Sequence, residues 1–174
     1  MKKSLLIFAV LLFCMSVKAQ TSPVDELFDK YADKEGFTSV FISGKMFGML
    51  AQLQPADSDK PNNFPKISSI RILTEDSLNL PKVNFYNELS KKLDFSAYEE
   101  LMVVKEQQEV TKFLIRKSGN TISEFLLISG GNGKNSLISI KGDIDLKQLS
   151  ELSKTTGIEE LQQLDNAEKK KPGK

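Results

Sequence analysis

The stretch LLISGGNGKNSLISI, residues 126–140, decides the fold of this 174-residue chain. Two apolar runs flank three glycines and a lysine, a pattern shared by strand hairpins and by loops that bind phosphate. A phosphate loop needs a glycine at position 128 and a hydroxyl at position 135, where this chain has Ile128 and Asn135. It also leads into a helix, whereas residues 137–140 look like another strand. The sequence therefore predicts a hairpin, with the glycines and Asn132 supplying the positive φ of a tight turn.

The sequence around this hairpin predicts a single α+β domain with a mostly antiparallel sheet. Strand-like runs follow one another at spacings of about a dozen residues, as in a meander. Two earlier strands should join the meander, and their connection would be a right-handed crossover if they lie parallel to each other. We expect helices packed on one face of the sheet and the other face partly open. The meander strands are predicted at residues 101–104, 112–115, 122–128 and 137–140, and the earlier strands at 37–42 and 67–73.

Four segments have the apolar spacing of amphipathic helices. The first has Ser22 as its cap, Pro23 at its first position and Gly36 beyond its end. The second can be capped by Ser43. The last begins at Asp145, and a weaker helical stripe follows it at residues 158–164. The predicted helices carry their apolar residues at 24–31, 46–53, 83–93 and 146–152.

The N-terminus predicts an exported chain. Lys2 and Lys3 precede an apolar run at residues 5–15, and residues 17–19 place small side chains at the −3 and −1 positions of a cleavage site. The competing interpretation, a transmembrane helix, needs about 20 apolar residues, and this run is shorter. Lipid attachment to Cys14 is disfavoured by the bulky residue that precedes it.

We therefore expect a signal peptide at residues 1–19, cleaved after Ala19, and a periplasmic or secreted mature chain without a membrane span. The folded domain should cover residues 20–165. The tail at residues 166–174 is charged and lacks apolar residues, so it is predicted to be disordered.

The composition restricts the chemistry of the mature chain. Removing the leader takes three of the 24 basic residues and none of the 23 acidic ones, which leaves a net charge of −2 and no basic excess for nucleic acid. The mature chain has no histidine, cysteine or tryptophan. It therefore lacks a base poised near neutral pH, an imidazole metal ligand and a thiolate nucleophile. We predict a non-enzymatic protein with no catalytic residue, no metal site and no cofactor.

Carboxylates are the chemistry that remains. Asp57 and Asp59 lie in a proline-rich loop at residues 54–66, and Asp143 and Asp145 precede the last predicted helix. Neither pair has the further ligands of a calcium-binding loop, so solvated loop and helix-cap roles are the simpler interpretations. A hydrolase using two carboxylates stays open as an alternative, because glycosidases need only such a pair.

Several short signatures occur in an order that resembles the domain-of-unknown-function family 4252, small exported proteins of Gram-negative bacteria. They are FTSVFISGKMFGML, ISSIRILTED, YEELMVVKEQQEVTKFLIRKSGNTISEFLLIS and, most specific, KGDIDLKQLSEL. The likeness covers residues 24–157. It implies export, a domain extent and a role in envelope sensing or signalling, and it implies no catalytic residue, cofactor or site.

These observations lead to one main functional hypothesis and one from another class. The first is a binding module of the bacterial cell envelope that takes an envelope protein or peptide on a sheet edge, an open sheet face or the proline-rich loop. The second is a carrier or sensor of an apolar or lipidic ligand held between sheet and helices. Phenylalanine and methionine at helical spacing are more often core residues. The candidate lining residues are Phe41, Met46, Phe47, Met49 and Phe85.

Overall fold

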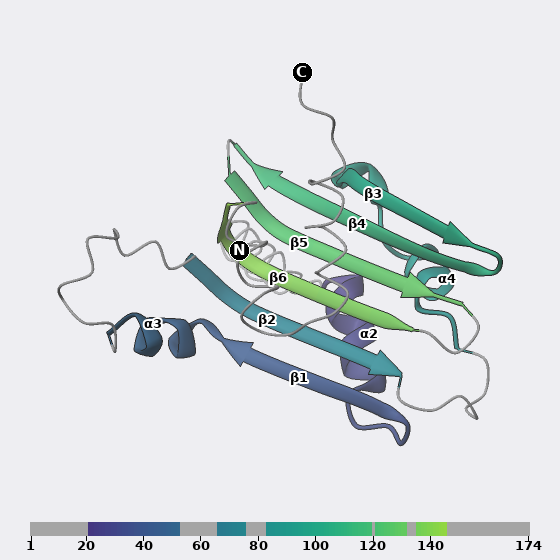
Figure 1. Cartoon of the computed structure of the whole chain (residues 1–174), viewed down its shortest axis with the longest axis horizontal. Coiled ribbons are helices and arrows are strands. Elements are labelled where there is room, and N and C mark those ends of the chain that lie inside the picture. The colour runs from purple at the N-terminus through teal and green to yellow at the C-terminus, as the bar shows by residue number, and fades with distance from the viewer. Residues whose placement is uncertain (1–20, 53–65, 76–82, 120, 132–134, 146–174) are drawn as a thin grey trace, which may run out of the picture.

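The computed structural model describes residues 21–52, 66–75, 83–119, 121–131 and 135–145, which form a single domain built on one six-stranded sheet (Figure 1). All neighbouring strands are antiparallel, in the order β1-β2-β6-β5-β4-β3. The strands are β1 (Phe37–Ser43), β2 (Lys66–Glu75), β3 (Glu99–Glu106), β4 (Glu109–Ser118), β5 (Thr121–Gly130) and β6 (Ser136–Ile144). The helices are α2 (Pro23–Tyr31), α3 (Gly44–Gln52) and α4 (Phe85–Leu89), with a 3-10 turn, η2 (Phe95–Ala97).

The predicted hairpin lies at the centre of the sheet. β5 pairs with β6 in an antiparallel register that brings Ser129 opposite Ser136. The glycine-rich stretch therefore joins two strands, and the prediction of a hairpin is confirmed. Gly131 has a φ of 148° and lies against the backbone of Gln108 and Glu109. A side chain at position 131 would be strained and would also collide with this neighbouring turn.

The predicted meander is confirmed, because β3, β4, β5 and β6 are consecutive neighbours in the sheet. The two earlier strands also join it, with β2 beside β6. The crossover expected for parallel strands does not occur. β1 and β2 pair antiparallel, with Val40 opposite Ile72. β1 ends and β2 begins at the same end of the sheet, where α3 lies (Figure 1), so antiparallel pairing needs no crossover of a face.

The prediction for the first helix, α2, agrees with the structure in its cap, its first residue and its buried side chains. The Ser22 side chain accepts a hydrogen bond from the Val24 amide at 3.2 Å, and Pro23 occupies the first helical position. Its predicted apolar stripe is buried against the sheet. The Tyr31 ring lies 4.9 Å from that of Phe37 and 5.4 Å from that of Phe85, centroid to centroid. This aromatic group joins α2, β1 and α4.

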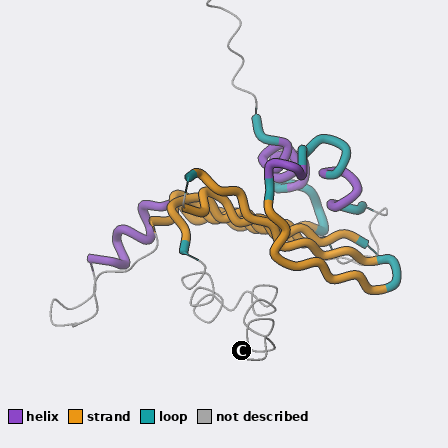
Figure 2. The backbone as a smooth tube through the Cα atoms, turned by 90° about the horizontal axis from the view of Figure 1, so that it is seen from above, coloured by secondary structure: helices purple, strands orange, loops and turns teal. Residues whose placement is uncertain are grey.

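Alternate side chains of the inner strands β2, β4, β5 and β6 form two apolar clusters, one on each face of the sheet. Figure 2 shows α2 and α4 on the same face. Of the helices within the described ranges, only α3 contributes to the other cluster, through Phe47. The buried residues on the helix-covered face are Val24, Leu27, Phe28, Tyr31, Leu73, Phe85, Leu89, Tyr98, Leu114, Leu126, Ile128 and Leu137. Those on the opposite face are Phe47, Ile67, Ile70, Phe113, Ile115, Ile122, Phe125, Leu127, Ile138, Ile140 and Ile144.

The helix predicted over residues 83–93 is shorter in the structure. Asn84 caps α4 by accepting a hydrogen bond from the Asn87 amide at 2.8 Å. The helix closes after Leu89, and Asp94 caps the short turn η2. Each cap accepts a hydrogen bond from a backbone amide and so starts a new helical element. Two such caps within a dozen residues therefore divide the predicted helix into two short elements.

Several predictions concern residues outside those the structure describes. They are the signal peptide, the proline-rich loop with Asp57 and Asp59, the helix beginning at Asp145, the stripe at residues 158–164 and the charged tail.

Two glycines of α3 allow a matched test of this packing. In Gly44→Ala, the new Cβ would lie 2.7 Å from the Ile67 carbonyl oxygen in β2, so we expect the free energy of unfolding to fall by about 1–3 kcal/mol. In Gly48→Ala, no neighbouring atom lies within 4 Å of the new Cβ. Alanine favours a helix more than glycine does, so the free energy of unfolding should rise by up to about 1 kcal/mol. Urea titrations of both variants measure the difference. Equal effects would contradict the close approach of α3 to β2.

Candidate functional site

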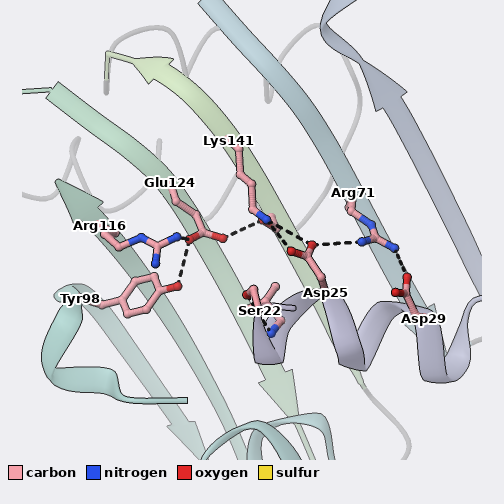
Figure 3. Close-up of polar contacts among 10 residues, drawn as sticks. Ser22, Asp25, Asp29, Arg71, Tyr98, Arg116, Glu124 and Lys141 are labelled. Carbon is pink, nitrogen blue, oxygen red and sulfur yellow. Dashed lines mark hydrogen bonds and ion pairs between the residues drawn. The ribbon is translucent and has the colours of Figure 1, made fainter. Parts of the chain in front are cut away.

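The first candidate is a polar network on the helix-covered face, centred on the buried carboxylate of Glu124 (Figure 3). The Tyr98 hydroxyl donates to its Oε2 at 2.9 Å, and the Ser139 hydroxyl donates to its Oε1 at 3.0 Å. The Arg116 guanidinium forms an ion pair with Oε2. β4, β5 and β6 meet here, because Glu124 lies opposite Arg116 on one side and Lys141 on the other, while Tyr98 directly precedes β3.

The network continues from the sheet to the start of α2. Asp25 accepts hydrogen bonds from Lys141 Nζ at 2.8 Å and from Arg71 Nη1 at 3.0 Å. Arg71 also pairs with Asp29 at 2.7 Å, and its guanidinium lies 4.5 Å from the centre of the Phe28 ring. Two cations of the sheet thus face two carboxylates on one side of α2, which fixes the helix to β2 and β6.

The chemistry of this network suits a structural role better than catalysis. Both oxygens of Glu124 accept hydrogen bonds, and no buried side-chain oxygen or nitrogen in the described part of the chain lacks a partner. Burial, and then the charge of Glu124, raise the pKa of Tyr98 far above its ordinary value of 10.0. The hydroxyl therefore stays protonated and acts as a donor. A base would need a lone pair that faces a substrate, whereas the Glu124 carboxylate is fully buried and accepts hydrogen bonds from protein side chains at both oxygens.

Sequence reasoning missed Glu124. The residue lies inside the apolar run of β5, where strand alternation accounts for the neighbouring side chains. The available signal was the charge itself, because a carboxylate is almost never fully buried without partners. The partners could not be named from sequence, since Tyr98 and Ser139 are 26 and 15 residues away in the chain.

A second buried polar residue, Asn135, immediately precedes β6. Its side-chain oxygen accepts a hydrogen bond from the Phe85 amide at 2.8 Å, and its amide nitrogen donates to the Val83 carbonyl at 2.9 Å. Its amide nitrogen also donates to the Glu75 carboxylate, at 2.5 Å. The position that a phosphate loop would fill with a hydroxyl thus holds α4 and β2 to β6.

No metal site is apparent in the described ranges, where no three acidic, histidine or cysteine side chains gather closely enough to hold an ion. Asp143 is exposed on β6. Asp145 ends the described chain, so its predicted role as a helix cap stays a prediction.

The five predicted lining residues do not gather at one place. Phe85 is buried on the helix-covered face and Phe47 on the opposite face, so the sheet separates them. Phe41, Met46 and Met49 are exposed, with 66%, 50% and 66% of their surface accessible. The described residues therefore do not form a shared lining from these five. Three of them form instead an exposed apolar corner where β1 leads into α3.

That corner adjoins an unusual edge of the sheet. β1 and β3 are the two edge strands. β3, EELMVVKE, carries four charged residues and a register shift between Glu100 and Met102. β1, FTSVFIS, has no charged residue, no proline and no register shift. Charges and bulges are the features by which proteins protect a sheet edge from pairing with another chain. β3 has both, and β1 has neither.

Among the described residues, no helix combines the length and apolar character needed to cross a membrane.

The sequence matches the family described as Domain of unknown function (DUF4252) over residues 31–152. The chain belongs to this family. The match begins at the last residue of α2 and contains all six strands. It is shorter at both ends than the extent of residues 24–157 inferred from the signatures. Comparisons with curated proteins and with solved structures gave no match. The DUF4252 assignment thus identifies the domain, and the activity has to be argued from its surface.

Tyr98→Phe tests the polar network. Loss of the hydrogen bond to Glu124 should lower the free energy of unfolding by about 1–2 kcal/mol near neutral pH. The pKa of Tyr98 is raised in the folded state, so the wild-type chain should lose stability as the pH rises above 10.0, where only the unfolded tyrosine ionises. The Tyr98→Phe variant has no such ionisable group, so the difference in stability between it and the wild-type chain should shrink in alkaline solution. Denaturant titrations across this pH range measure it, and a constant deficit would contradict a protonated donor.

Proposed function

We propose that this DUF4252 protein is a non-enzymatic binding module of the bacterial cell envelope, and that β1 with the exposed side of α3 is its docking surface. The partner would contribute an extended segment that pairs with the outer edge of β1. Main-chain hydrogen bonds would supply affinity, and the apolar side chains at the corner would supply specificity.

The contrast between the two edge strands carries this proposal. An uncharged strand of seven residues at a sheet edge is an aggregation hazard unless something covers it. β3 is protected by charge and irregularity, so the same chain has the means to protect an edge. Within the described residues no strand pairs with the outer edge of β1, and a partner that occupies this edge accounts for its lack of protection.

The exposed apolar side chains next to β1 support the same surface. Met46 and Met49 are three residues apart and lie on one side of α3, while Phe47 points into the core. Phe41 lies opposite Arg71 in the β1–β2 ladder. Large apolar side chains grouped at one corner are typical of binding surfaces, and methionine adapts to the shape of its partner.

The polar network gives less support to the hydrolase alternative. A carboxylate pair would need to face an open cleft, whereas Glu124 is buried and Asp25 is held by Lys141 and Arg71. The predicted leader would direct the mature chain out of the cytoplasm, and the resemblance to exported proteins supports the proposed envelope location. Export and cleavage after Ala19 are part of this proposal and can be read directly from the N-terminus of the purified protein.

Site-specific photo-crosslinking in cells tests the docking surface. A photoreactive residue replaces Phe41 at the β1 edge or, as the matched control, Leu101 at the β3 edge; both are exposed apolar residues of an edge strand. We expect a discrete crosslinked species from position 41 and none from position 101, because only the first edge is predicted to be occupied.

Two results would contradict this proposal. One is the same pattern of species from both positions, which would indicate random collisions. The other is the absence of any species from position 41 while the protein is folded and present in the envelope.

A further inference from the structure

We propose that the partner of β1 is a second copy of the same chain, joined by antiparallel pairing of the two β1 strands around a two-fold axis at Val40. This inference rests on the proposed docking surface and names its occupant. The two six-stranded sheets would then continue as one sheet of twelve strands, with a charged β3 at each outer edge.

The length and alternation of β1 define this register. Val40 is the middle residue of the seven in β1. Pairing around Val40 places Phe37 opposite Ser43 of the second copy and Ser39 opposite its Phe41. Opposite residues in an antiparallel pair lie on the same face of a sheet, and this pairing meets that condition at all seven positions. The helix-covered faces of both copies would therefore lie on the same side.

The side chains brought together are compatible. β1 contains no charged residue, so no like charges meet along the seven pairs. Val40 meets its own counterpart, which gives a contact between two β-branched side chains. The exposed ring of Phe41 would pack over Ser39 of the other copy, where a small side chain leaves room for it.

Among the described residues, β1 pairs with a strand on one side only, through β2. After Ser43 the chain turns towards β2, and Gly44 lies against the backbone of Ile67 and Ser68. α3 accordingly contacts β2 more extensively than it contacts β1. The start of α3 is thus held against β2 and does not continue along the outer edge of β1.

Val40→Lys tests the two-fold axis. Two ammonium groups would meet directly opposite each other, so the dissociation constant of the dimer should rise about tenfold or more. Leu101→Lys is the matched control, because Leu101 is 39% exposed on β3 and Val40 is 38% exposed on β1. Sedimentation equilibrium of the full chain over a range of concentrations gives both constants. A monomeric wild-type chain, or equal effects of the two substitutions, would overturn the inference.

A disulfide provides a measurement that does not depend on the strength of association. In a full chain carrying Cys14→Ser, Val40→Cys should form a covalent dimer on mild oxidation, because opposite residues of an antiparallel pair come within reach of a disulfide. Leu101→Cys in the same background should stay monomeric.

The crosslinked species from position 41 separates this inference from the proposed function. Peptides of this chain alone support a second copy. If the species contains peptides of another envelope protein and the wild-type chain is monomeric, the docking surface is supported and the dimer is overturned.

Discussion

The antiparallel pairing of β5 with β6 is the constraint on which the rest of the structure depends. These two central strands are apolar on both faces, so every element added to the sheet has to continue a layer that is buried on both sides. β2 and β4 continue both layers, and burial falls off only at the edges. The close approach of Gly131 to the β3–β4 turn shows that this hairpin also positions the neighbouring hairpin.

A sheet with two apolar faces raises the question of how its helices are held in one orientation. The apolar contacts of α2 could tolerate a rotated or shifted helix, since hydrophobic contact has little directionality. The ion pairs that Asp25 and Asp29 form with Lys141 and Arg71 would be broken by such a rotation or shift. Each pair fixes the distance between a particular helix position and a particular strand. Glu124 is bound in turn by Arg116 and Tyr98 beside this contact. We interpret this network as a register device that specifies one packing of α2.

Sequence alone predicted the strands, the hairpin and α2, because each depends on local periodicity, on capping by Ser22 and on the glycines of the turn. It could not predict that β1 and β2 would be antiparallel, since the length of their connection allows either direction. It also failed to separate Phe47 from Phe85. Both have the spacing of buried residues, and only the position of each element decides which face of the sheet a side chain meets. Glu124 was missed for a similar reason, because its partners are distant in sequence.

The two edges of the sheet determine how an assembly of this chain would end. If the partner of β1 were any sheet with another bare edge, strand addition could continue and would produce fibres. Pairing of β1 with β1 of a second copy uses both bare edges at once. The edges that remain are two β3 strands, each with four charged residues and a register shift that disfavour further pairing. A two-fold arrangement would therefore be closed, because a charged and irregular β3 would lie at each outer edge of the dimer.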